Sequence, residues 1–223
     1  MTQADKILDF LTKLPDPGPL PKGVDVMNPF TDPRAFALVQ RFYRKYYNDN
    51  TPRIAILGIN PGRFGGGITG IPFTDPIKLE KYCGIENDYD KRGELSADFI
   101  YRMIEAYGGP EAFYGRFYIS AVSPLGFVLN GKNMNYYDDA ELERGLHTFI
   151  IQCLNTQLVF PLDRKRCFCL GEGKNFKYLV KLNRDHAFFD EIIPLPHPRF
   201  IMQYRRKRVE EYVRRYVDAL NAE

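Results

Sequence analysis

Four short apolar runs, each associated with a helix-like segment, constrain the fold of this chain most. The runs with strand character span 53–59, 116–122, 165–170 and 190–195. In the segments between and after them, apolar residues recur at the spacing of amphipathic helices. Strands that alternate with helices favour a parallel sheet with helices on both faces. The sequence therefore predicts an α/β fold of three layers around a short, mostly parallel, four-stranded central sheet.

The helix boundaries carry recognisable capping residues. Thr31-Asp32-Pro33 is typical of a cap and first turn, and a helix is expected to follow as far as Tyr46. Ser96 is expected to cap a second helix that Gly108-Gly109 ends, and Asp138-Asp139 to open a third. Two further helices are predicted over 173–182 and 209–220, and the proline-rich stretch 14–29 is predicted to be extended.

Length and composition indicate one ordinary globular unit. A chain of 223 residues is near the size of one α/β domain, and we find no internal repeat or low-complexity linker, so residues 1–223 are expected to form a single domain. No run of 18 apolar residues occurs and the first residues lack a signal-peptide pattern, which predicts a cytoplasmic protein without membrane partners. The four cysteines lack the paired spacing of a zinc or iron–sulfur site, so we expect buried thiols, no metal and no cofactor.

Two polar motifs follow the first and the last predicted strand. Gly58-Ile59-Asn60-Pro61-Gly62 comes after the first, and Pro196-His197-Pro198-Arg199 after the last. Ligands of parallel sheets bind at the carboxyl ends of the strands, so both motifs are expected at the binding edge. The glycine spacing fits neither a dinucleotide fingerprint nor a phosphate-binding loop. An ordinary β-turn is the alternative for Asn-Pro-Gly, and a capped loop is the alternative for the histidine.

The first motif, continued by Thr69-Gly70-Ile71-Pro72-Phe73, resembles motif one of the single-strand-selective monofunctional uracil-DNA glycosylases. Pro196-His197-Pro198 resembles the second motif of that family. Ser123-Pro124-Leu125, with Gly131-Lys132-Asn133 beyond it, resembles a divergent copy of the central motif. The resemblance implies a uracil-DNA glycosylase-like fold. It also implies a monofunctional DNA glycosylase of base excision repair that hydrolyses the N-glycosidic bond of uracil, with other deaminated bases as further candidates.

The chemistry of base excision agrees with these motifs. Glycosidic cleavage passes through an oxocarbenium-like state, and negative charge grows on the leaving base, so fixed hydrogen-bond donors are needed there. His197 can donate to a uracil carbonyl oxygen, and the resemblance implies that Asn60 orients the attacking water. Asp75 is a less favoured carboxylate nearby. A flipped base would stack on Phe73, in a pocket that Ile59 and Gly62 also line.

Two departures from the family pattern concern the pocket and its rim. The family has an asparagine two residues before its central motif, where it reads the uracil edge, whereas this chain has Ala121. Ser120 and Ser123, beside it, are the expected substitutes. Arg199 stands where a serine and a further proline are usual. These differences indicate a diverged, bacterial-type branch with an altered base range.

A basic stretch after the second motif predicts contact with DNA. Residues 199–208 interleave apolar side chains with cations, a pattern used to fill the gap left by a flipped base and to hold phosphates. A solvated helix face is the alternative. The predicted DNA-binding residues are Arg63, Arg199, Phe200, Met202, Arg205, Arg206 and Arg208. The expected partner is DNA containing uracil or another deaminated base, with no obligatory protein partner; a hydrolase of free nucleosides or nucleotides and a non-catalytic DNA-binding module are the alternative functions.

Overall fold

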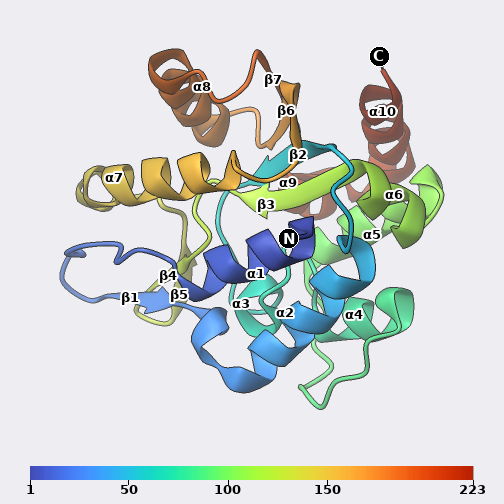
Figure 1. Cartoon of the computed structure of the whole chain (residues 1–223), viewed down its shortest axis with the longest axis horizontal. Coiled ribbons are helices and arrows are strands. Elements are labelled where there is room, and N and C mark those ends of the chain that lie inside the picture. The colour runs from blue at the N-terminus through green and yellow to red at the C-terminus, as the bar shows by residue number, and fades with distance from the viewer. Residues whose placement is uncertain (223) are drawn as a thin grey trace.

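The computed structural model describes residues 1–222 and contains a four-stranded parallel sheet. The strand order is β3-β2-β6-β7, and every neighbouring pair is parallel (Figure 1). The strands comprise Arg53–Gly58 (β2), Phe117–Ala121 (β3), Leu162–Leu170 (β6) and Glu191–Leu195 (β7). The predicted central sheet is thus confirmed, although β6 begins three residues before the predicted run.

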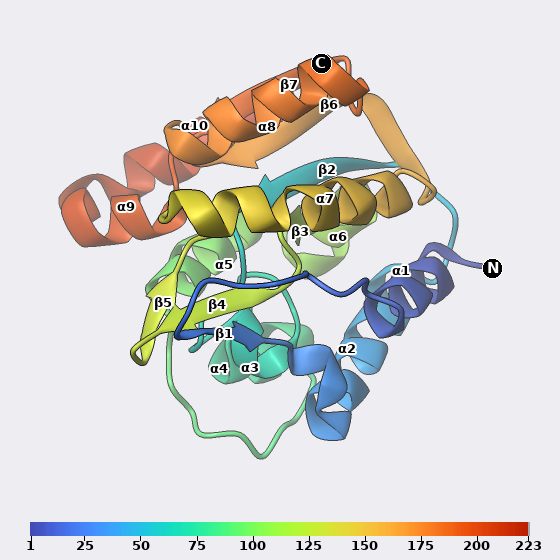
Figure 2. The ribbon, with the colours of Figure 1, turned by 90° about the vertical axis from the view of Figure 1, so that its left-hand side faces the viewer.

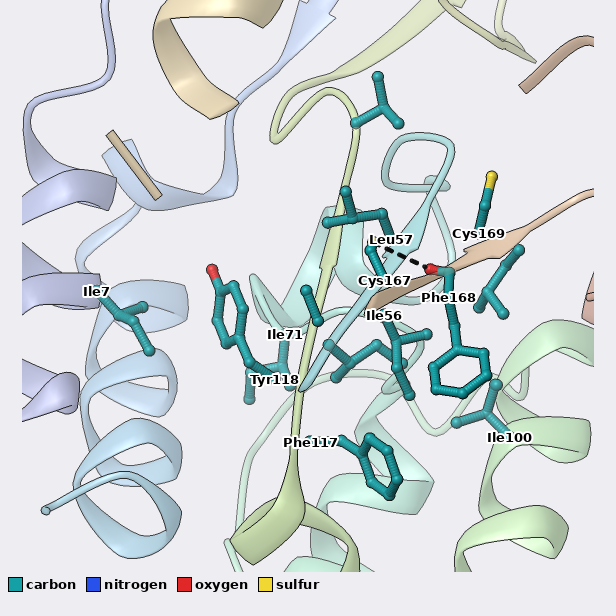
Figure 3. Packing of buried hydrophobic residues seen from close by; sticks show 14 of the residues in the cluster. Ile7, Ile56, Leu57, Ile71, Ile100, Phe117, Tyr118, Cys167, Phe168 and Cys169 are labelled. Atoms are coloured by element: carbon teal, nitrogen blue, oxygen red, sulfur yellow. Dashed lines mark hydrogen bonds between the residues drawn. The ribbon is translucent and has the colours of Figure 1, made fainter. Parts of the chain in front are cut away.

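Helices cover both faces of this sheet (Figures 1 and 2). Two neighbouring residues of β3 point to opposite faces of the sheet, because successive side chains of a strand alternate. The Phe117 ring packs at 5.4 Å against Tyr107 of α5 (Leu95–Tyr107), whereas the Tyr118 hydroxyl donates to Gln157 of α7 (Ala140–Gln157) at 3.1 Å. Figure 3 shows Phe117 and Tyr118 on opposite sides of the strand. The three-layer arrangement therefore follows from strands that are apolar on both faces.

The remaining helices connect the strands and close the ends of the molecule. They are α1 (Gln3–Thr12), α2 (Pro33–Tyr46), α3 (Gly66–Thr69), α4 (Pro76–Cys83), α6 (Pro110–Arg116), α8 (Lys174–His186), α9 (Pro198–Tyr204) and α10 (Val209–Asn221), with 3₁₀ turns at Pro29–Thr31 and Arg206–Arg208. The predicted caps are confirmed for α2 and α7, where the Asp32 and Asp139 side chains accept backbone N–H bonds. The prediction for α5 is wrong by two residues, since Glu94 and not Ser96 occupies the N-cap.

Helices α3, α4 and α6 were not among the predicted elements, and two further features lie outside them as well. One is α1; Arg53 ties its first turn to the sheet, because its buried guanidinium donates to Gln3 Oε1 at 2.7 Å and to Asp49 Oδ1 at 2.8 Å. The other is a small antiparallel sheet of β1 (Val24–Met27), β4 (Gly126–Leu129) and β5 (Lys132–Met134), in the order β1-β4-β5. The predicted extended stretch 14–29 supplies its edge strand β1.

The interior is closely packed around the parallel sheet. The four cysteines are buried and unpaired, as the sequence predicts, and burial raises their thiol pKa values. In residues 1–222, none of the helices combines the length and apolar character that crossing a bilayer requires.

Candidate active site

The two motif loops meet at the carboxyl edge of the parallel sheet. Asn60 follows the end of β2 by two residues, and His197 follows the end of β7 by two residues. Both loops line one cavity above the strand ends. The residues predicted from the sequence that line this cavity are Ile59, Asn60, Gly62, Phe73, Ser120, Ala121, His197 and Arg199.

The Phe73 ring forms an aromatic wall of the cavity because residue 58 has no side chain. A Cβ at Gly58 would lie 2.7 Å from the Phe73 Cζ atom, so only glycine leaves room for the ring. Phe73 has a φ of 53°, in the left-handed region, and the turn before it is closed by the Thr69 hydroxyl, which donates to the Thr74 carbonyl at 2.6 Å. The ring centroids of Phe73 and His197 are 6.2 Å apart, so a flat apolar face and an imidazole border the same space.

His197 is held as a neutral hydrogen-bond donor. Its Nδ1 accepts the Arg199 backbone N–H at 3.1 Å and thereby caps α9, so the ring hydrogen belongs on Nε2. Burial, together with the nearby Arg199 charge, lowers the pKa of His197 from 6.5 to about 4. The Tyr216 hydroxyl of α10 donates to the Pro196 carbonyl and thereby holds the His197 loop in place. At neutral pH the imidazole is therefore uncharged, with Nε2–H left to donate to a ligand.

The Asn60 carboxamide connects the first motif loop to the segment after β5. Its Nδ2 donates to the Met134 carbonyl at 3.1 Å, and its Oδ1 accepts the Tyr136 backbone N–H at 3.1 Å. A carbonyl oxygen has two lone pairs, so one remains on Oδ1 for a water molecule. The side chain is thus fixed in orientation before any ligand enters.

Three polar residues near the motifs have structural partners. Asp75 is fully buried and caps α4, where its carboxylate accepts the Lys78 and Glu94 backbone N–H groups at 2.8 and 2.9 Å. Ser123 is also fully buried, and its hydroxyl donates to the Leu125 carbonyl at 2.9 Å. Ser123 does not line the cavity, contrary to the prediction, and Ser120 lines it but donates its hydroxyl to Gln157 Oε1 at 2.8 Å.

Sequence reasoning missed several polar residues of the cavity wall, among them Glu94 and Asn133. Glu94 Oε2 lies only 2.5 Å from where a Cβ of Gly65 would be, so the glycine of motif one makes room for this carboxyl group. Burial raises the pKa of Glu94, and the Asp75 charge raises it further. No local pattern in the sequence distinguishes Glu94 from the charged, exposed residues before it. Asn133 belongs to the stretch that resembles the central motif, which is the signal that could have identified it.

The basic stretch after His197 divides into exposed and buried residues. Phe200 and Tyr204 are exposed on α9, by 41% and 61%, and their rings lie 5.7 Å apart. Met202, on the opposite side, is only 4% exposed and belongs to the hydrophobic core. The prediction that Met202 contacts DNA is therefore wrong, because the turn of α9 directs it inward.

The arginines predicted to bind DNA differ in whether other residues already contact their guanidinium groups. The Arg208 guanidinium pairs with Glu211, with Nε and Oε2 2.8 Å apart, and Arg205 lies over the Phe200 ring at 5.3 Å. Arg206 is exposed and has no ion pair within residues 1–222. On the other rim, Arg63 lies over the Phe64 ring at 4.6 Å.

Comparison with known proteins assigns this architecture to a class of DNA-repair enzymes. A model of the uracil DNA glycosylase superfamily matches residues 44–221. The chain is similar to the crystal structure of wild-type SMUG2 from Pedobacter heparinus, with 49% sequence identity, a TM-score of 0.95 and coverage of 98% of this chain and 97% of that chain. No curated protein matches the sequence.

The chain belongs to the uracil-DNA glycosylase superfamily, and its activity is the hydrolytic removal of uracil from DNA in base excision repair. The resemblance expected from the motifs and the predicted fold class are both confirmed.

Proposed function

We propose that His197 and Asn60 together carry out hydrolysis of the N-glycosidic bond. The observation that carries the proposal is the neutral His197 imidazole, fixed beside the Phe73 ring at the strand edge. A preorganised neutral donor stabilises charge that develops on a leaving base without first losing a proton. Base excision requires a donor of this kind, because negative charge develops on the leaving base.

The proposed mechanism assigns one role to each motif residue. The flipped base stacks on Phe73, and His197 Nε2–H donates to a base carbonyl oxygen as the C1′–N1 bond lengthens. The Asn60 Oδ1 accepts a hydrogen bond from the attacking water and orients its oxygen toward C1′. As the C1′–O bond forms, the proton that the water loses goes to the departing base anion, directly or through solvent. Asn60 is an amide and takes no proton, so its contribution is positional.

The substrate is a DNA chain, and the proposed DNA contacts lie beside the cavity. Arg199 lines the cavity itself, the exposed Phe200 follows it on α9, and Arg206 lies in the 3₁₀ turn after that helix. We further propose that the whole chain acts as one domain, in the cytoplasm, without an obligatory protein partner. Other deaminated bases are proposed as additional substrates, because Ala121 leaves the cavity without the amide that would restrict it to uracil.

The test is excision from a single-stranded oligonucleotide that carries one uracil, scored by strand scission after alkali. Wild-type protein should release uracil and leave an abasic site that breaks only on alkaline treatment, since a monofunctional enzyme does not cut the strand. Free deoxyuridine at the same concentration should turn over far more slowly. Equal turnover of free deoxyuridine would instead favour a nucleoside hydrolase.

A further inference from the structure

We propose that Glu94 and Asn133 together read the hydrogen-bonding edge of the excised base. Glu94 accepts a ring N–H, and Asn133 donates to the adjacent carbonyl oxygen. The inference rests on the proposed function, because it names the specificity-determining residues of the same cavity.

The residues expected to recognise the base edge lack free polar side-chain atoms for it. Ala121 has no polar side-chain atom. The Ser120 hydroxyl is committed to Gln157, and the Asn60 amide has backbone partners on both sides. Selection of one base therefore needs other polar groups of the cavity wall.

Glu94 and Asn133 flank one small space beside Gly62. A Cβ at Gly62 would lie 3.3 Å from Asn133 Nδ2 and 3.7 Å from Glu94 Oε1. A side chain at position 62 would fill this space, and the glycine leaves it open to a ligand. Both residues also line the cavity that contains Phe73 and His197.

Glu94 is held through its backbone and Asn133 through its side chain. The Glu94 backbone N–H donates to the buried Asp75 carboxylate at 2.9 Å. The Asn133 Oδ1 accepts the Arg63 backbone N–H at 3.2 Å, so its Nδ2 is the end left for another partner. Burial raises the pKa of Glu94, although hydrogen bonds from Ser96 and the Ala97 backbone and the Arg199 charge act in the opposite direction, and a ring N–H would be a further donor to the carboxylate.

The hydrogen-bonding edge of uracil is complementary to these two side chains. Uracil presents N3–H beside a C4 carbonyl, which matches a carboxylate acceptor beside an amide donor. Hypoxanthine and xanthine present the same pair at N1–H and the C6 carbonyl. Cytosine presents an unprotonated N3 and an amino group, so both contacts would be repulsive. The pair therefore selects deaminated bases as a class and rejects cytosine.

The experiment measures the preference for uracil over cytosine in variants that remove or exchange the donor and the acceptor. We would measure the affinity of single-stranded oligonucleotides that carry 2′-fluoro-2′-deoxyuridine or 2′-fluoro-2′-deoxycytidine, in which the fluorine slows cleavage. Wild-type protein should prefer the uracil probe. Glu94→Ala and Asn133→Ala should each lower that preference by about 10-fold, the scale of one or two lost hydrogen bonds. The double variant Glu94→Gln/Asn133→Asp should prefer the cytosine probe.

Matched controls separate the possible outcomes. Glu105→Gln changes an exposed carboxylate on the same helix and should leave the preference unchanged. Unchanged preference in folded Glu94 and Asn133 variants would overturn the inference, while uracil excision by the wild type would leave the proposed function intact. If the wild type releases no uracil, the proposed function itself fails. Should the double variant not fold, Asn133→Ala decides alone, because Asn133 is exposed and its replacement costs little stability.

Discussion

The two loops that form the cavity are built in opposite ways. The first, from Gly58 to Asp75, is tied by internal hydrogen bonds and close glycine contacts, and its polar side chains have protein partners. The second continues from His197 into α9 and presents exposed aromatic and cationic side chains. The residues that position the base, His197 among them, are therefore fixed before binding, whereas the exposed side chains that follow on α9 and meet the DNA backbone remain free to adapt.

Within the first loop, the largest effect is expected for Asn60, at its centre. Asn60→Ala should lower the single-turnover rate of uracil excision by about 10²-fold, because a water-orienting group acts in the transition state. It should also reduce the free energy of unfolding by about 1 kcal/mol for each lost bond to Met134 and Tyr136. DNA affinity should stay near that of the wild type. Unchanged excision in the folded variant would remove Asn60 from the mechanism.

A smaller effect is expected for Gly58, which makes room for the aromatic wall. In Gly58→Ala the new methyl group would displace the Phe73 ring from its position 2.7 Å away, and excision should fall about 10-fold as the stacking surface shifts. Gly115→Ala is the matched control, since its added Cβ meets no atom within 4 Å. Equal rates for the two variants would mean that the position of Phe73 does not matter.

Substitutions in the exposed segment should change the affinity for DNA and not the rate of excision. Arg206→Gln should weaken binding of single-stranded DNA a few-fold at low salt and make the salt dependence shallower by about one charge. Arg208→Gln should do less, because Glu211 already neutralises that guanidinium. Binding measured from low to high salt compares the two directly. A steeper loss for Arg208 would place the DNA on the other side of the 3₁₀ turn.

The smallest expected effect is on stability at acid pH. Folding lowers the pKa of His197 from 6.5 to about 4, so the unfolded chain binds more protons across this interval. The free energy of unfolding should therefore rise with pH from about 4 to about 6.5, and His197→Asn, which keeps a capping side chain, should remove this part of the dependence. Urea denaturation at several pH values measures it. An identical pH dependence in the variant would show that the histidine is not held neutral by the fold.

The sequence predicted the parts of the molecule that local patterns specify. The Asp32 and Asp139 caps were correct, and the predicted bounds of β2 and β7 lie within one residue of the observed ones, because capping and strand composition act over a few residues. The small sheet was missed, since its strands have only three or four residues and its edge strand β1 pairs with β4 across about a hundred positions. The first helix depends in a similar way on the buried contact between Arg53 and Gln3.

The site was predictable to the extent that it lies at the strand ends. Asn60 and His197 lie where parallel strands must bring them, so their meeting needed no tertiary detail. Met202 was assigned wrongly because a helix of seven residues shows too little periodicity to identify its buried face. Glu94 was missed because its place against Gly65 depends on how α5 packs beside the motif loop.

The division between a fixed pocket and an adaptable DNA-binding loop can be tested by one paired measurement. Single-turnover excision rates at saturating enzyme and DNA affinities would be determined for wild type, His197→Ala and Arg206→Gln on the same single-stranded uracil substrate. His197→Ala should lower the rate by about 10²- to 10³-fold with little change in affinity, and Arg206→Gln should weaken affinity with little change in rate. If both variants lowered rate and affinity in the same proportion, the fixed pocket and the exposed DNA-binding segment would not have separate roles, and the account would be contradicted.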